Sequence, residues 1–119
     1  MNIEDLREYC IKKPFVSEGL PFGPDVLVLK VMEKVFLLCP LNAENMQMNL
    51  KCEPEWAIEL REIYPSVQPG YHMNKKHWNT VDFEGALEER LLRQLIDHSY
   101  EQVVKSLKRA EREALAGYS

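Results

Sequence analysis

Residues 26–39 read VLVLKVMEKVFLLC, two apolar runs that are separated by a charged step at Glu33-Lys34. β-branched and other apolar side chains dominate both runs, as they do in paired strands. The stretch therefore predicts a β-hairpin with its tip at Glu33-Lys34. Two-residue hairpin loops favour Asn-Gly or Asp-Gly, so we expect this loop to be slightly longer. Because the strands of a hairpin run antiparallel, the fold is expected to contain an antiparallel sheet.

Strand patterns also occur on both sides of this hairpin. Residues 46–52 (MQMNLKC) alternate apolar and polar side chains, which is typical of a half-buried strand. Residues 67–83 have strand character on either side of a polar tip around residues 74–76, which predicts a second hairpin. Residues 15–25 contain too many glycines and prolines for a helix.

Three helices are expected, over residues 2–13, 53–64 and 86–107. Asn2 can cap the first helix, Pro54 suits the first position of the second, and a leucine stripe runs along the third. The order of elements predicts one α+β domain over residues 1–107. In it, an antiparallel sheet of about five to six strands carries the N-terminal, middle and long C-terminal helices. Residues 108–119 are expected to form a charged C-terminal tail.

The composition limits the classes of protein to which this chain can belong. The chain has 119 residues, 45% of them hydrophobic and 29% charged, which indicates a single globular domain. No apolar run approaches the ~20 residues that cross a bilayer, and acids within the first five residues do not fit a secretory signal. We therefore expect a cytoplasmic protein that makes no membrane contact. Three widely spaced cysteines without a CxxC pair disfavour a zinc site and predict reduced, mostly buried thiols.

Positive charge is concentrated locally in a chain of net charge -4. Residues 1–70 hold 7 basic and 11 acidic side chains, whereas residues 71–119 hold 8 of each. The sharpest feature is YHMNKKHWNT at residues 71–80, where two lysines and two histidines lie beside the predicted tip, with Tyr71 and Trp78 on its arms. Cationic side chains contact phosphates and flat rings stack on bases, so this stretch is a candidate nucleic-acid site. The alternative is a solvated turn whose aromatic rings belong to the core.

No pattern predicts catalysis or a cofactor. His72 and His77 could approach each other across a hairpin, but only Asp82 or His98 suggests itself as a third metal ligand. Asp97-His98-Ser99 are neighbours on a predicted helix and point in different directions, so they cannot form a catalytic relay with one another. We therefore expect no enzymatic activity, no metal and no cofactor.

Three segments carry a resemblance to a known family. LKCEPE at residues 50–55, YHMNKKHWNTV at 71–81 and LIDHSY at 95–100 resemble the MmcQ/YjbR family. The first helix and the PFGPD segment before the hairpin also fit, so the resemblance covers residues 1–107. Glu53 stands where the family more often has Asp, a better helix cap.

The resemblance implies a small α+β domain, described as CyaY-like and compared with double-wing DNA-binding proteins. Members are usually called predicted DNA-binding proteins, and the resemblance implies no enzymatic activity, metal or cofactor. It implies a wing-like hairpin that contains Lys75, Lys76, His77, Trp78 and Asn79, with Asn74 at the tip and with Lys51 and His72 on nearby strands.

Three functional hypotheses follow. The first is a monomeric cytoplasmic DNA-binding domain in which the lysines contact phosphates, His77 and Asn79 contact a groove edge or phosphate, and Trp78 braces or stacks. Its binding is expected to be weak and salt-sensitive. The second is a protein-interaction module that offers a sheet face or edge with Gln47, Asn49 and Lys51 exposed. The third is a small-molecule or metal site formed by His72, His77 and Asp82. The direction of the Trp78 side chain is the fact that best separates a structural signature from a binding surface.

Overall fold

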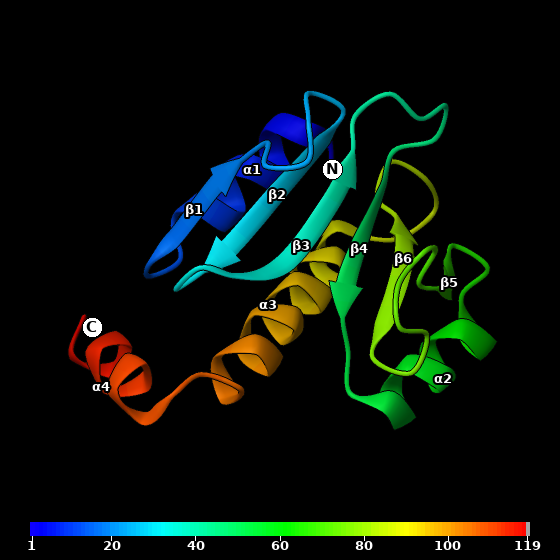
Figure 1. The fold of residues 1–119 in the computed structure, drawn as a ribbon. Helices are drawn as coiled ribbons and strands as arrows, with labels where there is room; N and C mark the ends of the chain where they lie inside the picture. Colours follow the sequence, from blue (N-terminus) through cyan, green and yellow to red (C-terminus); the bar gives the residue numbers. More distant parts are fainter. Residues whose placement is uncertain (119) are drawn as a thin grey trace.

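Six antiparallel strands form one open sheet, in the order β1-β2-β3-β4-β6-β5 (Figure 1). The computed structural model describes residues 1–118. The strands are Val16–Gly19 (β1), Val26–Val31 (β2), Lys34–Pro40 (β3), Gln47–Lys51 (β4), Val67–Pro69 (β5) and Trp78–Asp82 (β6). The helices are Ile3–Ile11 (α1), Pro54–Ile63 (α2), Glu89–Lys105 (α3) and Arg109–Tyr118 (α4). The predicted single α+β domain with a sheet of five to six antiparallel strands is confirmed.

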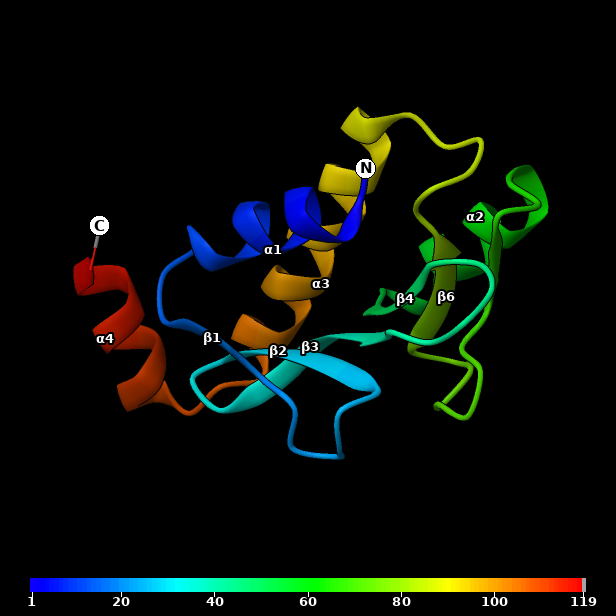
Figure 2. The same ribbon diagram turned by 90° about the horizontal axis from the view of Figure 1, so that it is seen from above.

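The helices α1, α2 and α3 lie on one side of the sheet, and the core fills the space between them (Figure 2). On β2, Leu27, Leu29 and Val31 point into this core, whereas the alternating residues Val26 and Lys30 face the other side. We call that other side the helix-free face, because no helix within residues 1–118 packs on it. Two loops reach past it, residues 20–25 and residues 70–77.

The β2–β3 hairpin has a shorter loop than the sequence predicts. Val31 pairs with Lys34, so the loop consists of Met32 and Glu33 alone. Both have positive φ angles, 49° and 68°, as a type I′ turn requires. The expectation of a longer loop with its tip at Glu33-Lys34 was wrong, because the strand pairing holds two non-glycine residues in the left-handed region.

A β-bulge in β3 turns two successive side chains into the core. Leu29 pairs with Leu37 and Lys30 pairs with Val35, so Phe36 is the extra residue. Phe36 and Leu37 are both fully buried, and the Phe36 ring packs edge-on against Tyr100 of α3. The bulge therefore increases the apolar surface that the sheet presents to α3.

Three boundaries of the first and third helices differ from the predictions. The capping box between Asn2 and Asp5 starts α1 as expected, but the helix ends at Ile11 rather than at residue 13. The third helix begins at Glu89 rather than at residue 86, because the chain after β6 makes a turn in which Asp82 accepts from the N–H of Glu84. It ends at Lys105, and the predicted tail contains a separate helix, α4. Residue 119 of that tail lies outside the described residues.

The predicted second hairpin has much shorter strands than expected. β5 contains only Val67–Pro69, and it pairs with residues 79–81 of β6. Residues 70–77 form a loop, so Tyr71 and His72 do not lie on strand arms as predicted. The reason is that His72 adopts a left-handed conformation, φ 58°, which no extended strand accommodates.

The three thiols are buried, as the sequence predicts. Cys10, Cys39 and Cys52 are free, and burial raises the pKa of each to about 12. Such thiols remain protonated and unreactive at neutral pH.

None of the helices within residues 1–118 is both long enough and apolar enough to span a bilayer.

Candidate nucleic-acid interface

Trp78 points to the helix-free face. Its neighbours along β6, Asn79 and Val81, are buried on the helix side, so the alternation of the strand turns Trp78 and Thr80 the other way. Trp78 is half-buried, and it pairs across the sheet with Lys51 of β4. Trp78 and Lys51 are therefore cross-strand neighbours on the helix-free face.

The loop of residues 70–77 folds back over the end of β6. The N–H of Gly70 donates to the carbonyl of Trp78 at 2.9 Å, and the N–H of Trp78 donates to the carbonyl of Asn74 at 2.9 Å. The contact is so close that a Cβ on Gly70 would lie 2.9 Å from both the Cβ and the carbonyl oxygen of Trp78. The Asn74 side chain accepts from the N–H of Lys76, which forms an Asx turn within the loop.

Two linked hydrogen bonds through the buried side chains of Thr80 and Asn49 hold the backbone of Tyr71 against the sheet. The hydroxyl of Thr80 donates to Oδ1 of Asn49 at 2.5 Å, and the hydroxyl oxygen of Thr80 accepts from the N–H of Tyr71 at 3.0 Å. The Tyr71 ring is 71% exposed, and its centroid lies 4.0 Å from that of the exposed His72 ring. Asn49 was predicted to be an exposed residue of a docking face, which is wrong, because it is buried and bonded to Thr80.

Three lysines border this surface. Lys75 and Lys76 are exposed on the loop, and Lys51 is half-exposed at the end of β4. The Lys75 ammonium donates to the carbonyl of Gly70, and none of the three forms an ion pair within residues 1–118. Their charge is therefore not neutralised by a neighbouring carboxylate of the described chain.

Arg61 of α2 fastens the loop to the body of the protein. Its Nε donates to Oδ1 of Asn79 at 2.6 Å, and its Nη2 donates to the carbonyls of Lys75 and Trp78. Asn79 is only 2% exposed, so the prediction that it contacts a groove edge or phosphate is wrong. Its amide is already occupied by Arg61 and the carbonyl of Ala57.

Sequence reasoning missed Arg61, Gly70 and Thr80 as residues that shape the site. A signal for Arg61 was present, because it is the only cation in the otherwise acidic segment PEWAIELREI. The close approach at Gly70 and the bond from Thr80 depend on contacts between segments, which a local pattern does not reveal.

The two remaining predicted residues have different surroundings. His72 is exposed beside Tyr71, but it belongs to the loop and not to a strand. His77 is half-buried, and its carbonyl accepts from the N–H of Cys52 at 2.7 Å, which joins the end of the loop to the segment after β4. The backbone of His77 is thus joined to the body of the protein, and His77 is less exposed than His72.

The described residues bring no three His, Cys, Asp or Glu side chains together as a metal would need. His98 is occupied in another way, because its Nε2 accepts from the N–H of Glu53 at 3.0 Å and its ring packs edge-on against Trp56. Burial lowers the pKa of His98, which favours the neutral ring that this bond requires.

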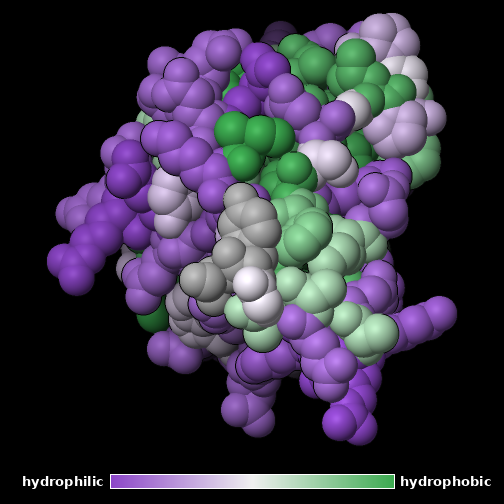
Figure 3. Space-filling model, turned by 90° about the vertical axis from the view of Figure 1, so that its left-hand side faces the viewer, coloured by the Kyte–Doolittle hydropathy of each residue, from purple (hydrophilic) through white to green (hydrophobic). Residues whose placement is uncertain are grey.

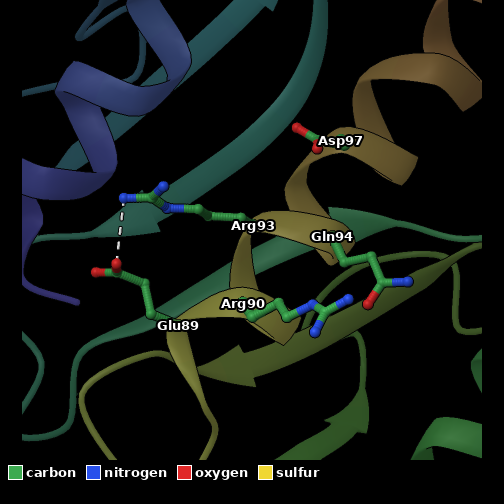
Figure 4. A pocket seen from close by; sticks show the side chains of 5 residues that line it. All are labelled: Glu89, Arg90, Arg93, Gln94 and Asp97. Carbon is green, nitrogen blue, oxygen red and sulfur yellow. Dashed lines mark ion pairs between the residues drawn. The ribbon is translucent and has the colours of Figure 1, made fainter.

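A hollow of about 450 Å³ lies on the outer side of α3, and Figure 4 shows that its lining comes from this one helix. Arg93 is paired with Glu89 at 3.1 Å, and Asp97 accepts from the Tyr9 hydroxyl at 2.6 Å and from Lys13 at 2.5 Å. Asp97 thus joins α1 and the residues that follow it to α3, whereas the pair of Arg93 and Glu89 lies within α3 itself. On the side that carries β1 and α4, an apolar patch lies within a mostly hydrophilic surface (Figure 3).

Comparison with known proteins identifies the family. The sequence model described as YjbR matches residues 11–102. This chain belongs to the YjbR family. The YjbR match confirms the resemblance that residues 50–55, 71–81 and 95–100 carry, and the loop of residues 70–77 lies inside it.

Relatives of this YjbR-family chain agree with it over nearly their whole length. The uncharacterized protein YbdF of Escherichia coli O157:H7 is 40% identical over 104 residues, which is 87% of this chain and 85% of YbdF. The uncharacterized protein YjbR of Escherichia coli strain K12 is 32% identical over 115 residues, which is 97% of this chain and 98% of that protein.

Solved structures share the fold. The crystal structure of the Deinococcus radiodurans protein DR2400, with a DUF419 domain, has a TM-score of 0.89 and 37% identity. The superposition covers 97% of this chain and 88% of DR2400. A crystal structure from Pseudomonas syringae has a TM-score of 0.73 at 30% identity, covering 83% of this chain and 96% of that one. The names of these YjbR-like proteins state no activity, so function is argued from the site.

Proposed function

We propose that this chain is a small cytoplasmic DNA-binding protein that acts as a monomer and has no enzymatic activity. The observation that carries the proposal is the group formed by Lys51, Lys75, Lys76 and Trp78 on the helix-free face. These lysines have no ion-pair partner within residues 1–118, and Trp78 lies directly across from Lys51. Ammonium groups that are free of carboxylates attract phosphates, and an indole ring that reaches the surface stacks on bases.

The number of cations limits the expected affinity. Each neutralised phosphate contributes about 0.7 to 0.9 to the slope of log K against log salt concentration, so three lysines give a slope of about 2 to 3. Proteins that bind tightly make several times more phosphate contacts. The net charge of -4 also repels DNA from the rest of the surface. We therefore expect weak binding that is lost at physiological salt.

A salt titration tests the proposal. Labelled DNA is titrated with the protein at several low salt concentrations, and the double variant Lys75→Ala/Lys76→Ala is compared with the unchanged protein. The variant is expected to reduce the slope by about 2 in log–log terms, because two phosphate contacts are removed. The matched control is Lys12→Ala/Lys108→Ala, which removes the same charge from two exposed lysines outside the loop. No binding at tens of micromolar protein, or an equal effect of the two double variants, would overturn the proposal.

A protein partner is the second candidate, and one observation favours it. A hollow of about 460 Å³ between α1 and the loop of residues 20–25 combines apolar side chains with charged ones; it is lined by Ile3, Leu20, Leu27 and Leu41 together with Glu4, Arg7 and Glu18. β4 is a central strand, so strand addition could occur only at the edge strands β1 and β5. Stoichiometric recovery of a protein from a lysate, unchanged by nuclease, would favour this candidate, whereas recovery that nuclease abolishes would favour DNA binding.

A further inference from the structure

The rings of the helix-free face are suited to unpaired bases. We infer that the DNA bound there is single-stranded, with bases stacked on Trp78 and on the ring pair of Tyr71 and His72. This inference rests on the proposed function, and it names the form of DNA that the same surface accepts. Stacking on aromatic side chains is available to every base of a single strand, whereas the bases of a duplex are stacked on one another.

The backbone holds both aromatic groups on one side of the sheet. Gly70 lies against the Cβ and carbonyl of Trp78, and the next residue, Tyr71, is bonded through its N–H to the outward-facing Thr80. The Tyr71 and His72 rings are tilted by 52° to each other, and their centroids lie 4.0 Å apart. Tyr71 is 71% exposed, so it is accessible to a base. A strand that crosses the face from Trp78 to Tyr71 meets a ring at both places.

The lysines lie near both groups of aromatic rings, where they can contact the phosphates of a bound single strand. Lys51 lies across from Trp78 in the strand register, and Lys75 and Lys76 lie on the loop that carries Tyr71. Phosphates on either side of a stacked base can therefore approach an ammonium group. Stacking supplies free energy that does not depend on charge, which compensates for the small number of cations in a chain of net charge -4.

The same loop is poorly shaped for a duplex. A major groove is read by a helix or by a two-stranded ribbon that projects from the protein. Here β5 pairs with β6 through only three residue pairs, and Arg61 fastens the following loop to α2. The helices α1 and α3 lie on the opposite face of the sheet. A duplex could therefore meet this face mainly through its phosphates.

The test compares an oligo-dT strand with a mixed-sequence duplex of the same length, at one low salt concentration. We expect the single strand to bind about tenfold more tightly, and we expect Trp78→Ala and Tyr71→Ala each to weaken its binding by about fivefold or more. The matched control is Phe22→Ala, because Phe22 is 69% exposed on the loop between β1 and β2 at the other edge of the sheet. This variant should leave the binding unchanged.

A fluorescence measurement keeps the test independent of how well Trp78→Ala folds. In the variant Trp56→Phe, Trp78 is the remaining tryptophan. Its emission should fall when oligo-dT is added and should change little with the duplex, because only unpaired bases stack on the indole.

The outcomes separate the two claims. Tighter binding of the single strand that Trp78→Ala and Tyr71→Ala weaken supports the inference. Equal or tighter binding of the duplex that Lys75→Ala/Lys76→Ala weakens overturns the inference and leaves the proposed function intact. Absence of binding to both forms at tens of micromolar protein overturns both.

Discussion

Nε of Arg61 on α2 lies 2.6 Å from Oδ1 of Asn79 on β6, and this bond connects the middle helix to the strand that carries Trp78. The same guanidinium donates to the carbonyls of Lys75 and Trp78. One half-buried side chain thus satisfies acceptors in the C-terminal part of the loop of residues 70–77 and at the start of β6. A planar guanidinium with five donors can do this, whereas an ammonium group cannot reach all three acceptors.

Arg61→Ala should loosen the loop and destabilise the protein by about 2–3 kcal/mol, since hydrogen bonds to a charged group contribute about 1.5–3 kcal/mol and Asn79 would be left buried without its main partner. Amide exchange of residues 70–78 is the direct measurement, and their protection should fall more than that of β2 and β3. Arg61→Lys should recover little of it. Arg90→Ala removes an arginine that is exposed on α3 and should leave the protection unchanged. Unchanged protection in Arg61→Ala would contradict the role assigned to Arg61.

Gly70→Ala should damage the same loop through lack of space. The added Cβ would lie 2.9 Å from the Cβ and the carbonyl oxygen of Trp78 and 3.0 Å from the Cβ of Met73. These atoms are close to the backbone and cannot move away cheaply, so we expect a loss of about 1–3 kcal/mol in urea unfolding. Gly19→Ala is the control, because the Cβ there meets only Pro21 Cδ at 4.0 Å. Equal stability of the two variants would show that the loop can shift away from Trp78.

The sheet was predictable from the sequence because its patterns are local. The alternation of residues 46–52 places Met48 and Leu50 in the core, as observed. The apolar runs of residues 26–39 likewise become β2 and β3. The segment that the family resemblance singled out forms the loop of residues 70–77, and Lys75 and Lys76 lie on it. Such features depend on neighbouring residues, so one sequence is enough to see them.

The shape of the loop was not predictable because it depends on distant partners. Tyr71 is held by Thr80 and Asn49, and the carbonyls of Lys75 and Trp78 are held by Arg61. Asn79 is instructive, because its place two residues before the buried Val81 already predicts an inward side chain. Because its side chain is a polar amide, Asn79 was instead predicted to be a surface contact residue. The bond from Arg61 on α2 explains how a buried amide is accommodated at this position.

Ser99 connects α3 to two strands at once. Its hydroxyl donates to the carbonyl of Phe36 at the bulge, at 2.6 Å, and accepts from the N–H of Lys51 at 2.8 Å. Ser99→Ala would leave both groups without this partner, so we expect a loss of about 2–4 kcal/mol, measured as a lower urea midpoint with an unchanged slope. Ser106→Ala is the control, since that exposed hydroxyl donates to Val103 within its own helix and its loss should cost less than about 0.5 kcal/mol. Similar losses in the two variants would contradict the connecting role.

Stability should fall as the pH is lowered through the titration of His98. Burial lowers the pKa of His98 in the folded protein, while lysine 105 lowers it further and Glu101 and Glu53 act in the opposite sense. The unfolded chain has a histidine pKa of about 6.5, so below that pH the unfolded state binds a proton more readily than the folded state. The contribution of His98 is therefore complete above the unfolded pKa and is lost as the pH falls through the folded pKa. The measurement is the urea midpoint at several values between about pH 7.5 and about pH 5.

His98→Gln isolates this effect from all other titrating groups. The glutamine amide oxygen can still accept from the N–H of Glu53, but it does not titrate. The measured pH range lies above the pKa values at which carboxylates usually titrate. Hydrogen bonds from Arg7 lower the pKa of Glu18, and backbone N–H donors lower that of Glu53, so both carboxylates keep their charge throughout this range. The midpoint of the unchanged protein should therefore fall more steeply with decreasing pH than that of His98→Gln. Proton binding at Nε2 of His98 removes the acceptor on which the bond from the N–H of Glu53 depends. Parallel pH profiles of the two proteins would therefore contradict the stabilising role of the neutral His98 ring.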